Sequence, residues 1–368
     1  MISGFQQALL LAFVLLFAFN LGAHYTGATV GMPYASRCIA LWPALAIVAI
    51  FALLGATFAS GSVEHTVGLR LIAEGHARAS IAIVIVACAG VLTMGFNRLR
   101  LPTSTIQILV FCVIGAALAA NLRVRWSTVI ELAIVWVSAP LASAALGFLL
   151  TRAADAIVPE HAAAQQARLL VQRAAERHPD DHLAASLPGL AHPLPADLLR
   201  EAAAERPAHP GLAVAALKAL PAVMVLVGIA ASFVMGSNDV ANATGVLLLV
   251  HFTSSPTAAG AIGGAGMFVG ALAWGSRILR RVAFDVVELD LAMASAAQGV
   301  QALVVILAVS EGLFTSMNQA LIAAMAGAGI ARGRETVNRR QLTAILRGWV
   351  VGPGAGLLLA YLMEMALR

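Results

Sequence analysis

The sequence predicts an all-α polytopic membrane protein, built from two inverted repeats of about five spans each with broken or re-entrant half-helices. Three observations carry this prediction. Of the 368 residues, 60% are hydrophobic and only 11% are charged, with a mean hydropathy of +0.89, and a soluble domain needs more charge than this. Long apolar segments recur along both halves of the chain. Several motifs of the first half also return in the second.

The apolar segments form two groups around one polar stretch. Spans are expected at residues 2–20, 39–60, 80–97, 102–120 and 126–150, and again at 212–235, 256–275, 290–310, 318–331 and 341–367. Two further pieces, 23–36 and 240–252, are shorter than the roughly 20 residues that a helical span requires, and they predict re-entrant or discontinuous helices. The expected domains are a first transmembrane repeat at 1–151, a cytoplasmic polar linker at 152–211 and a second transmembrane repeat at 212–368.

The two halves share one register. Thr103-Ser104 in the first half corresponds to Thr315-Ser316 in the second, and Trp136 corresponds to Trp349. These offsets lie near roughly 213 residues, as an internal repeat requires. An odd number of crossings in each half would invert the second copy in the membrane. Inverted repeats of this kind are typical of secondary transporters.

The charges indicate orientation and partners. Basic residues follow one span of the second half and precede the last, namely Arg277, Arg280, Arg281, Arg332, Arg334, Arg339 and Arg340. This bias places the basic loops and the central linker in the cytoplasm of a multi-pass protein of the cell (inner or plasma) membrane, with the lipid bilayer as its surroundings. No basic cluster with interleaved aromatic residues indicates nucleic-acid binding. The three cysteines lack the spacing of a metal site.

A polar patch interrupts the apolar sequence of the second half. Residues 236–245 read GSNDVANATG, so Asp239 lies at membrane depth among small and amide side chains. An acidic residue there is costly without a partner, which makes it a functional candidate. Gly236 and Gly245 bracket the patch and are expected to let the helix break. The alternative is a buried Asp that only caps a broken helix.

This decapeptide resembles the signature of the inorganic phosphate transporter (PiT) family, GANDVANAFG, and departs from it only at Ser237 and Thr244. The resemblance extends over nearly the whole chain outside the linker and is stronger in the second half. It implies a secondary active transporter, a cation-coupled symporter that moves inorganic phosphate across the cell membrane, and not an enzyme. It also implies coupling to Na⁺ or H⁺, no other cofactor, and a homodimer.

The patch is expected to bind the anion and the coupled cation. Asn238 and Asn242 are one helical turn apart, and their amides can both donate to an oxyanion. Asp239 could accept the proton of a hydrogen phosphate, bind sodium, or itself carry the coupled proton.

A second motif occurs once in each half. It consists of hydroxyl residues followed by a glutamine: Thr103, Ser104, Thr105 and Gln107, and then Thr315, Ser316 and Gln319. It resembles the family motif GLPVSTTH, with Gln in place of His. Hydroxyl residues before an apolar run cap helix N-termini, whose free amides attract anions. Two such half-helices converging from inverted repeats are expected to bind a tetrahedral dianion, and the alternative is two ordinary capped helices.

The first half has lost its acidic residue. In the shared register, His24 and Tyr25 replace the Asn-Asp pair and Ala28 replaces the second Asn. His24 and Tyr25 either donate hydrogen bonds to the anion or fill the volume of the lost pair. The family's sulfate-permease branch also lacks this pair, and sulfate carries no proton near neutral pH. A permease for sulfate or another tetrahedral oxyanion is therefore the alternative function.

Another segment supplies candidate ligands for a coupling ion. Residues 286–290, VVELD, resemble the TELDP segment of the family and are followed by Gln298. Glu288 and Gln298 are candidate sodium ligands alongside Asp239, and the alternative for this segment is an interfacial ion-pair cluster with Arg277. A channel-like pore and a membrane-embedded enzyme are the rival classes. Only two local polar patches occur, and no intramembrane Ser/His pairing supports catalysis.

Overall fold

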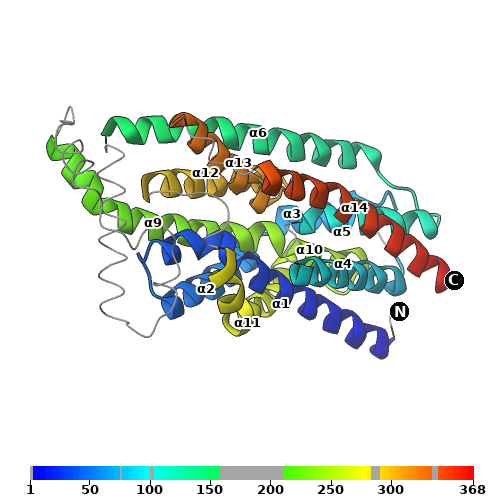
Figure 1. The fold of residues 1–368 in the computed structure, drawn as a ribbon. Coiled ribbons are helices and arrows are strands. Elements are labelled where there is room, and N and C mark those ends of the chain that lie inside the picture. Colours follow the sequence, from blue (N-terminus) through cyan, green and yellow to red (C-terminus); the bar gives the residue numbers. More distant parts are fainter. Residues whose placement is uncertain (1–2, 75–76, 100–102, 158–209, 283–290, 334–338) are drawn as a thin grey trace.

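The computed structural model describes residues 3–74, 77–99, 103–157, 210–282, 291–333 and 339–368, and all the regular elements of these ranges are helices (Figure 1). The first half contains α1 (Gly4–Ala35), α2 (Leu41–Ala59), α3 (Gly61–His65), the π-helix η1 (Thr66–Arg70), α4 (Ala79–Leu99), α5 (Thr105–Ala119) and α6 (Trp126–Ile157). The second half contains α9 (Pro210–Asp239), α10 (Ala241–Leu249), α11 (Pro256–Val282), α12 (Leu291–Ser310), α13 (Met317–Ala331) and α14 (Arg339–Ala366). The all-α prediction is confirmed, while most of the predicted linker, 158–209, lies outside the described residues.

Among the described residues, eight helical segments are long and apolar enough to cross a membrane, four in each half. The prediction of about five spans in each half is corrected at α5 and α13. Each of these helices has 15 residues, which is about 22 Å at 1.5 Å per residue and is shorter than a hydrocarbon core of about 30 Å. Ser104 and Ser316 cap these helices, so each helix begins only after its hydroxyl residues.

The helix is interrupted within the polar patch at 236–245, as predicted, and the backbone N–H of Ala243 bonds to the carbonyl oxygen of Val240 at 2.9 Å. α9 continues to Asp239 and α10 begins at Ala241, while Val240 between them keeps helical angles of φ −59° and ψ −36°. Residues 23–36, expected to form a separate short piece, lie within or at the end of the continuous α1. A Cβ atom added to Gly236 would lie 2.0 Å from the carbonyl oxygen of Ala52. This glycine therefore permits close helix packing, and the short half-helices of this protein are α5 and α13.

Corresponding helices of the two halves make the same contacts with the opposite half. α1 packs on α11 as α9 packs on α2, and α6 packs on α13 as α14 packs on α5. A Cβ atom on Gly22 would meet the Met267 carbonyl oxygen at 2.1 Å, as one on Gly236 would meet that of Ala52. In Figure 1, α1 and α9 run in opposite directions, and so do α6 and α14. These exchanged contacts and opposite directions are what an inverted repeat predicts.

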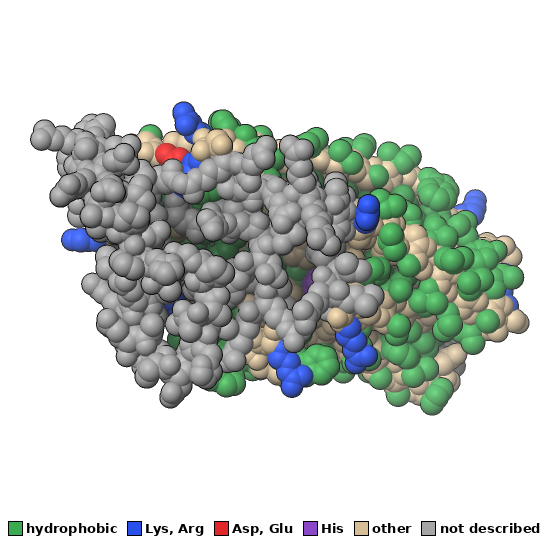
Figure 2. Space-filling view, viewed as in Figure 1, with side chains coloured by type: hydrophobic (Ala, Val, Ile, Leu, Met, Phe, Trp, Pro, Cys, Tyr) green, Lys and Arg blue, Asp and Glu red, His purple; other side chains and the backbone are tan. Residues whose placement is uncertain are grey.

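The outer surface is apolar. Large side chains such as Trp42 and Phe58 are 70% and 74% exposed. Figure 2 shows hydrophobic side chains covering much of the described surface on the right of the view, with scattered basic side chains. An apolar surface this extensive is compatible with lipid and not with water. The polar groups that a soluble protein would expose lie instead at the centre of the bundle.

Candidate ion and substrate site

Two capped helix N-termini form the frame of the site. Ser104 caps α5 by accepting from the backbone N–H of Gln107 at 3.4 Å, and Ser316 caps α13 by accepting from that of Gln319 at 3.4 Å. The hydroxyl residues of both motifs are fully buried, namely Thr103, Ser104, Thr105, Thr315 and Ser316. The positive ends of two helix dipoles therefore lie inside the protein, where an anion would be stabilised.

The side chains of Gln107 and Gln319 connect the two half-helices. The Gln319 Nε2 donates to the Gln107 Oε1 at 3.3 Å, across the interface between the halves. Both side chains are buried, and the Gln319 Oε1 accepts no hydrogen bond from the described residues. The structure thus brings the two motifs together at their first helical turns.

Asn238 holds the backbone that precedes α13. Its Nδ2 donates to the carbonyl oxygen of Thr315 at 2.9 Å, and its Oδ1 accepts from the backbone N–H of Thr315 at 3.2 Å. This reciprocal pair uses both ends of the amide. Asn238, expected to be an anion ligand, therefore fixes the position of the α13 N-terminus in this structure.

Asp239 is fully buried beside that amide. Its Oδ2 accepts from the Asn238 Nδ2 at 3.1 Å, while its Oδ1 accepts no hydrogen bond of normal geometry from the described residues. The Tyr25 hydroxyl also faces this carboxyl group. The ion pairs of the described residues lie elsewhere, as the pair of Arg70 and Glu131 does at 2.7 Å. A buried carboxylate without a cation requires either a proton or a bound cation.

Asn242 reaches the other half-helix. Its Nδ2 donates to the Thr105 hydroxyl at 3.3 Å, and its Oδ1 has no partner among the described residues. Asn238 and Asn242, one turn apart on the same chain, thus contact α13 and α5 respectively. The signature segment bridges the two halves.

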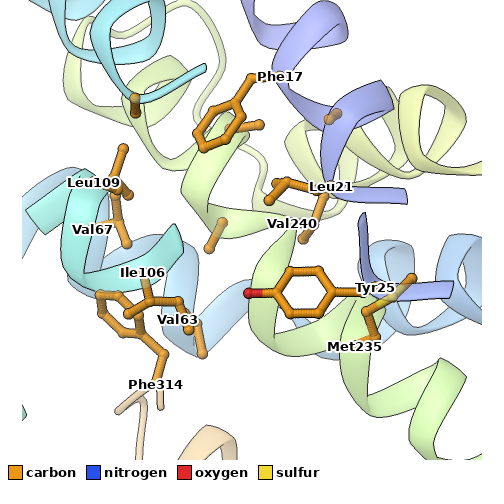
Figure 3. Close-up of a cluster of buried hydrophobic side chains, with 14 of the residues drawn as sticks. Phe17, Leu21, Tyr25, Val63, Val67, Ile106, Leu109, Met235, Val240 and Phe314 are labelled. Atoms are coloured by element: carbon orange, nitrogen blue, oxygen red, sulfur yellow. The ribbon is translucent and has the colours of Figure 1, made fainter. Parts of the chain in front are cut away.

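The replaced pair of the first half also points into this centre. The Tyr25 hydroxyl lies 2.7 Å from the Thr105 hydroxyl, and the His24 Nε2 lies 3.3 Å from the Nδ2 of Asn318 on α13. Figure 3 shows the Tyr25 ring beside Met235 and Val240, with its hydroxyl directed toward α5. Tyr25 therefore makes a hydrogen bond within the site and does more than fill volume.

Several buried oxygens of the site have no partner among the described residues. They are the Asp239 Oδ1, the Asn242 Oδ1, the Gln319 Oε1 and the hydroxyls of Thr103 and Thr315. Carboxylate and amide oxygens are ligands for a hard cation, and free hydroxyls can donate to an oxyanion. Buried polar groups rarely remain unpaired, so the arrangement is suited to receive an anion and a cation together.

Gln298 on α12, a predicted sodium ligand, bonds to α1 and not to the residues of this cluster. The Gln298 Nε2 donates to the carbonyl oxygens of Ala28, at 3.2 Å, and Thr29, both on α1. Glu288 lies outside the described residues.

The sequence reasoning also missed two residues that hold the backbone around the start of α13. The Trp136 Nε1 donates to the carbonyl oxygen of Phe314 at 3.0 Å, and the Gln301 Nε2 donates to that of Met317 at 3.2 Å. Trp136 was visible as part of the repeat, but no local signal gave its partner.

Two capped half-helices that meet near a buried carboxyl group inside a multi-pass helical bundle are typical of transporter folds. The sequence model of the phosphate transporter family matches residues 21–360, and the chain belongs to that family. This is a family of transporters, which agrees with the predicted multi-pass membrane protein and with the prediction of a transporter rather than an enzyme.

Three known proteins illustrate the relationship. A protein named as a phosphate permease in Haemophilus influenzae is 32% identical over 162 residues, which is 41% of this chain and only 39% of that protein. The sulfate permease CysP of Bacillus subtilis is 23% identical over 354 residues, covering 95% of this chain and 85% of that protein. A solved structure titled "The sodium-dependent phosphate transporter" superimposes with a TM-score of 0.78 at 20% identity, covering 98% of both chains. This last likeness supports the fold.

Proposed function

We propose that this protein is a cation-coupled symporter that moves inorganic phosphate across the cell membrane. The observation that carries the proposal is the meeting of the α5 and α13 N-termini, joined through Gln107 and Gln319, beside the carboxyl group of Asp239. Two helix dipoles attract a dianion without Lys or Arg. Hydrogen phosphate also carries a proton, which the unpartnered Oδ1 of Asp239 can accept.

The proposed roles are assigned from the atoms of the site that have no hydrogen-bond partner among the described residues. The hydroxyls of Thr103 and Thr315 and the amides at the two helix starts bind the anion. Asn242 and Gln319 offer unpaired amide oxygens at the same centre. Asp239 carries or balances the coupled cation, either Na⁺ or H⁺, and Asn238 keeps the α13 N-terminus in place.

A sulfate permease is the second candidate, and a specific observation favours it. Tyr25 stands where the repeat places the counterpart of Asp239, and its neutral hydroxyl can donate to an anion but is a weaker acceptor for a substrate proton than a carboxylate. A site with fewer acceptors suits sulfate, which is fully ionised. The similarity to the Bacillus sulfate permease over most of the chain agrees with this alternative.

Uptake into proteoliposomes separates the two substrates. Radiolabelled phosphate uptake is measured with sulfate as competitor, with a sodium gradient and a pH gradient each present or absent. Phosphate uptake that sulfate barely inhibits is expected, because Asp239 retains an acceptor for the substrate proton. Dominant sulfate uptake would move this chain to the sulfate branch. The homodimer and the cytoplasmic side of the linker stay predictions.

Replacing Trp136 with Phe is expected to slow uptake moderately. The change removes the Nε1–H donor to the Phe314 carbonyl oxygen and loosens the turn before α13. A lost hydrogen bond of about 1 kcal/mol corresponds to roughly fivefold in uptake at low substrate concentration. Trp42→Phe is the matched control, since Trp42 is 70% exposed on the outer surface. Equal uptake by the two variants would contradict the positioning role of Trp136.

A further inference from the structure

A second buried carboxyl group lies outside the site described above. Glu64 on α3 is fully buried, and its Oε1 lies 2.6 Å from the Thr244 hydroxyl on α10. Its Oε2 has no hydrogen-bond partner among the described residues. The Ser60 hydroxyl, at the start of α3, also faces this carboxyl group. The family signature has Phe at position 244, so the Thr244 hydroxyl is a feature of this chain.

The hydrogen bonds around Glu64 fit a protonated acid. The Thr244 hydroxyl lies 3.0 Å from the Val240 carbonyl oxygen, and the Ser60 hydroxyl lies 2.5 Å from that of Ala56. A hydroxyl has one hydrogen. If both hydroxyls donate to these carbonyls of their own helices, each presents a lone pair to Glu64. A protonated Glu64 then donates its single hydrogen to the Thr244 hydroxyl, whose own hydrogen goes to the Val240 carbonyl oxygen.

An ionised Glu64 is satisfied less well. It would draw the Thr244 hydrogen away from Val240, and it would still leave a charge in a fully buried position. No described Lys, Arg or His lies within ion-pair distance of it. Burying an unpaired charge is far costlier than burying a neutral acid.

The elements packed against α3 bring no opposing charge to Glu64. α10 and α12 contain no titratable residue. Arg70 of η1 pairs with Glu131, and His65 on α3 itself is exposed. α11 faces α3 through Pro256 and Gly260 in its first turns. Two elements carry titratable residues elsewhere along their length: Lys218 and Asp239 on α9, and Arg277, Arg280 and Arg281 on α11.

The position of Glu64 connects it to the transport site. Thr244 lies on α10, which begins directly after Asp239 and Val240. On the other side, the Thr66 hydroxyl donates to the Gly312 carbonyl oxygen at 2.6 Å and ties the π-helix to the end of α12. A shift of α10 relative to α3 would break the bond between Glu64 and Thr244. π-helical turns often occur at functional sites.

We propose that Glu64, with the hydroxyls of Thr244 and Ser60, is a proton-binding site separate from Asp239, which takes up and releases one proton in each transport cycle. The proton binding stands on the hydrogen-bond geometry alone. Its use in coupling rests on the proposed transport function.

Proton binding is tested first without transport. Infrared difference spectra of the purified protein in lipid nanodiscs, acidic minus alkaline, are expected to contain a carboxylic-acid carbonyl band that Glu64→Gln removes. Asp239→Asn and the exposed control Glu311→Gln are expected to retain it. Thr244→Val, which removes the hydroxyl acceptor, is expected to shift the pH at which the band reaches half of its full intensity. A band that persists in Glu64→Gln would overturn the site.

Coupling is tested by the same variant in proteoliposomes. A glutamine amide can donate to Thr244 as the protonated acid does, so Glu64→Gln is expected to elute as folded protein and to transport the anion. Its uptake is expected to lose the dependence on a pH gradient that the unchanged protein and Glu311→Gln show. An infrared band assigned to Glu64 together with unchanged proton dependence would overturn the coupling role. If the unchanged protein transports neither phosphate nor sulfate, the proposed function fails while the infrared result still decides the proton site.

Discussion

Asp239→Asn is expected to abolish coupled uptake while leaving the protein folded. The substitution keeps the shape of the side chain and an oxygen that can accept from Asn238, so packing around α9 is retained. It removes the only negative charge beside the two half-helix N-termini that the described residues provide. Loss of one partner from a buried charge pair costs about 3–5 kcal/mol, which corresponds to roughly 150- to 5,000-fold in cation affinity.

The measurement is the initial rate of phosphate uptake at several sodium concentrations and external pH values. Glu131→Gln is the matched control, because it removes a carboxylate from a solvent-exposed pair with Arg70, and such pairs contribute at most about 1 kcal/mol. Full sodium- and pH-dependent uptake by Asp239→Asn would refute the assignment of Asp239 as the coupling residue. Loss of uptake in the control as well would point to instability of the preparation.

The sequence was sufficient to predict the helical class, the capped half-helices and the residues around which the site forms. Ser104 and Ser316 were expected to be caps because hydroxyl residues before an apolar run satisfy the first free amides of a helix. Each hydroxyl does accept a hydrogen bond from the backbone N–H three residues later in the chain. Helix capping depends only on residues that are close together in the chain, so the sequence alone is enough to predict it. Asp239 was identifiable because an acidic residue at membrane depth has few structural explanations.

The partners of these residues and the exact position of the break in the signature segment could not be predicted. Asn238 pairs with the backbone of Thr315, and Thr244 pairs with Glu64, which is 180 residues away. A backbone partner leaves no mark in the sequence. Glycines and asparagines lower helix propensity, so a break within 236–245 was predictable, and α9 ends there at Asp239. The break lies at Val240 and at neither of the bracketing glycines, which propensity alone does not specify.

Gly236→Ala is expected to destabilise the whole protein. The added Cβ would lie 2.0 Å from the Ala52 carbonyl oxygen and 2.8 Å from the Ala56 nitrogen, both of which are backbone atoms. Neither can move without separating α2 from α9, so the variant must expand the centre of the bundle. Overpacking of this kind costs about 1–3 kcal/mol, and each kcal/mol lowers Tm by roughly 2–4 °C in a medium-sized domain.

Two glycine controls separate packing from function in this prediction. Gly354→Ala on α14 meets no atom within 4 Å and is expected to leave Tm unchanged, whereas Gly22→Ala would place its Cβ 2.1 Å from the Met267 carbonyl oxygen and should lower Tm about as much as Gly236→Ala does. Uptake per folded molecule should differ between these last two. Expansion at Gly236 displaces Asn238, which holds the backbone before α13 through two hydrogen bonds, whereas expansion at Gly22 displaces Tyr25, which makes one side-chain hydrogen bond, to Thr105. Equal Tm values for Gly236→Ala and Gly354→Ala would show that the helices can separate freely, and the close packing of α2 on α9 would then not be what positions the site.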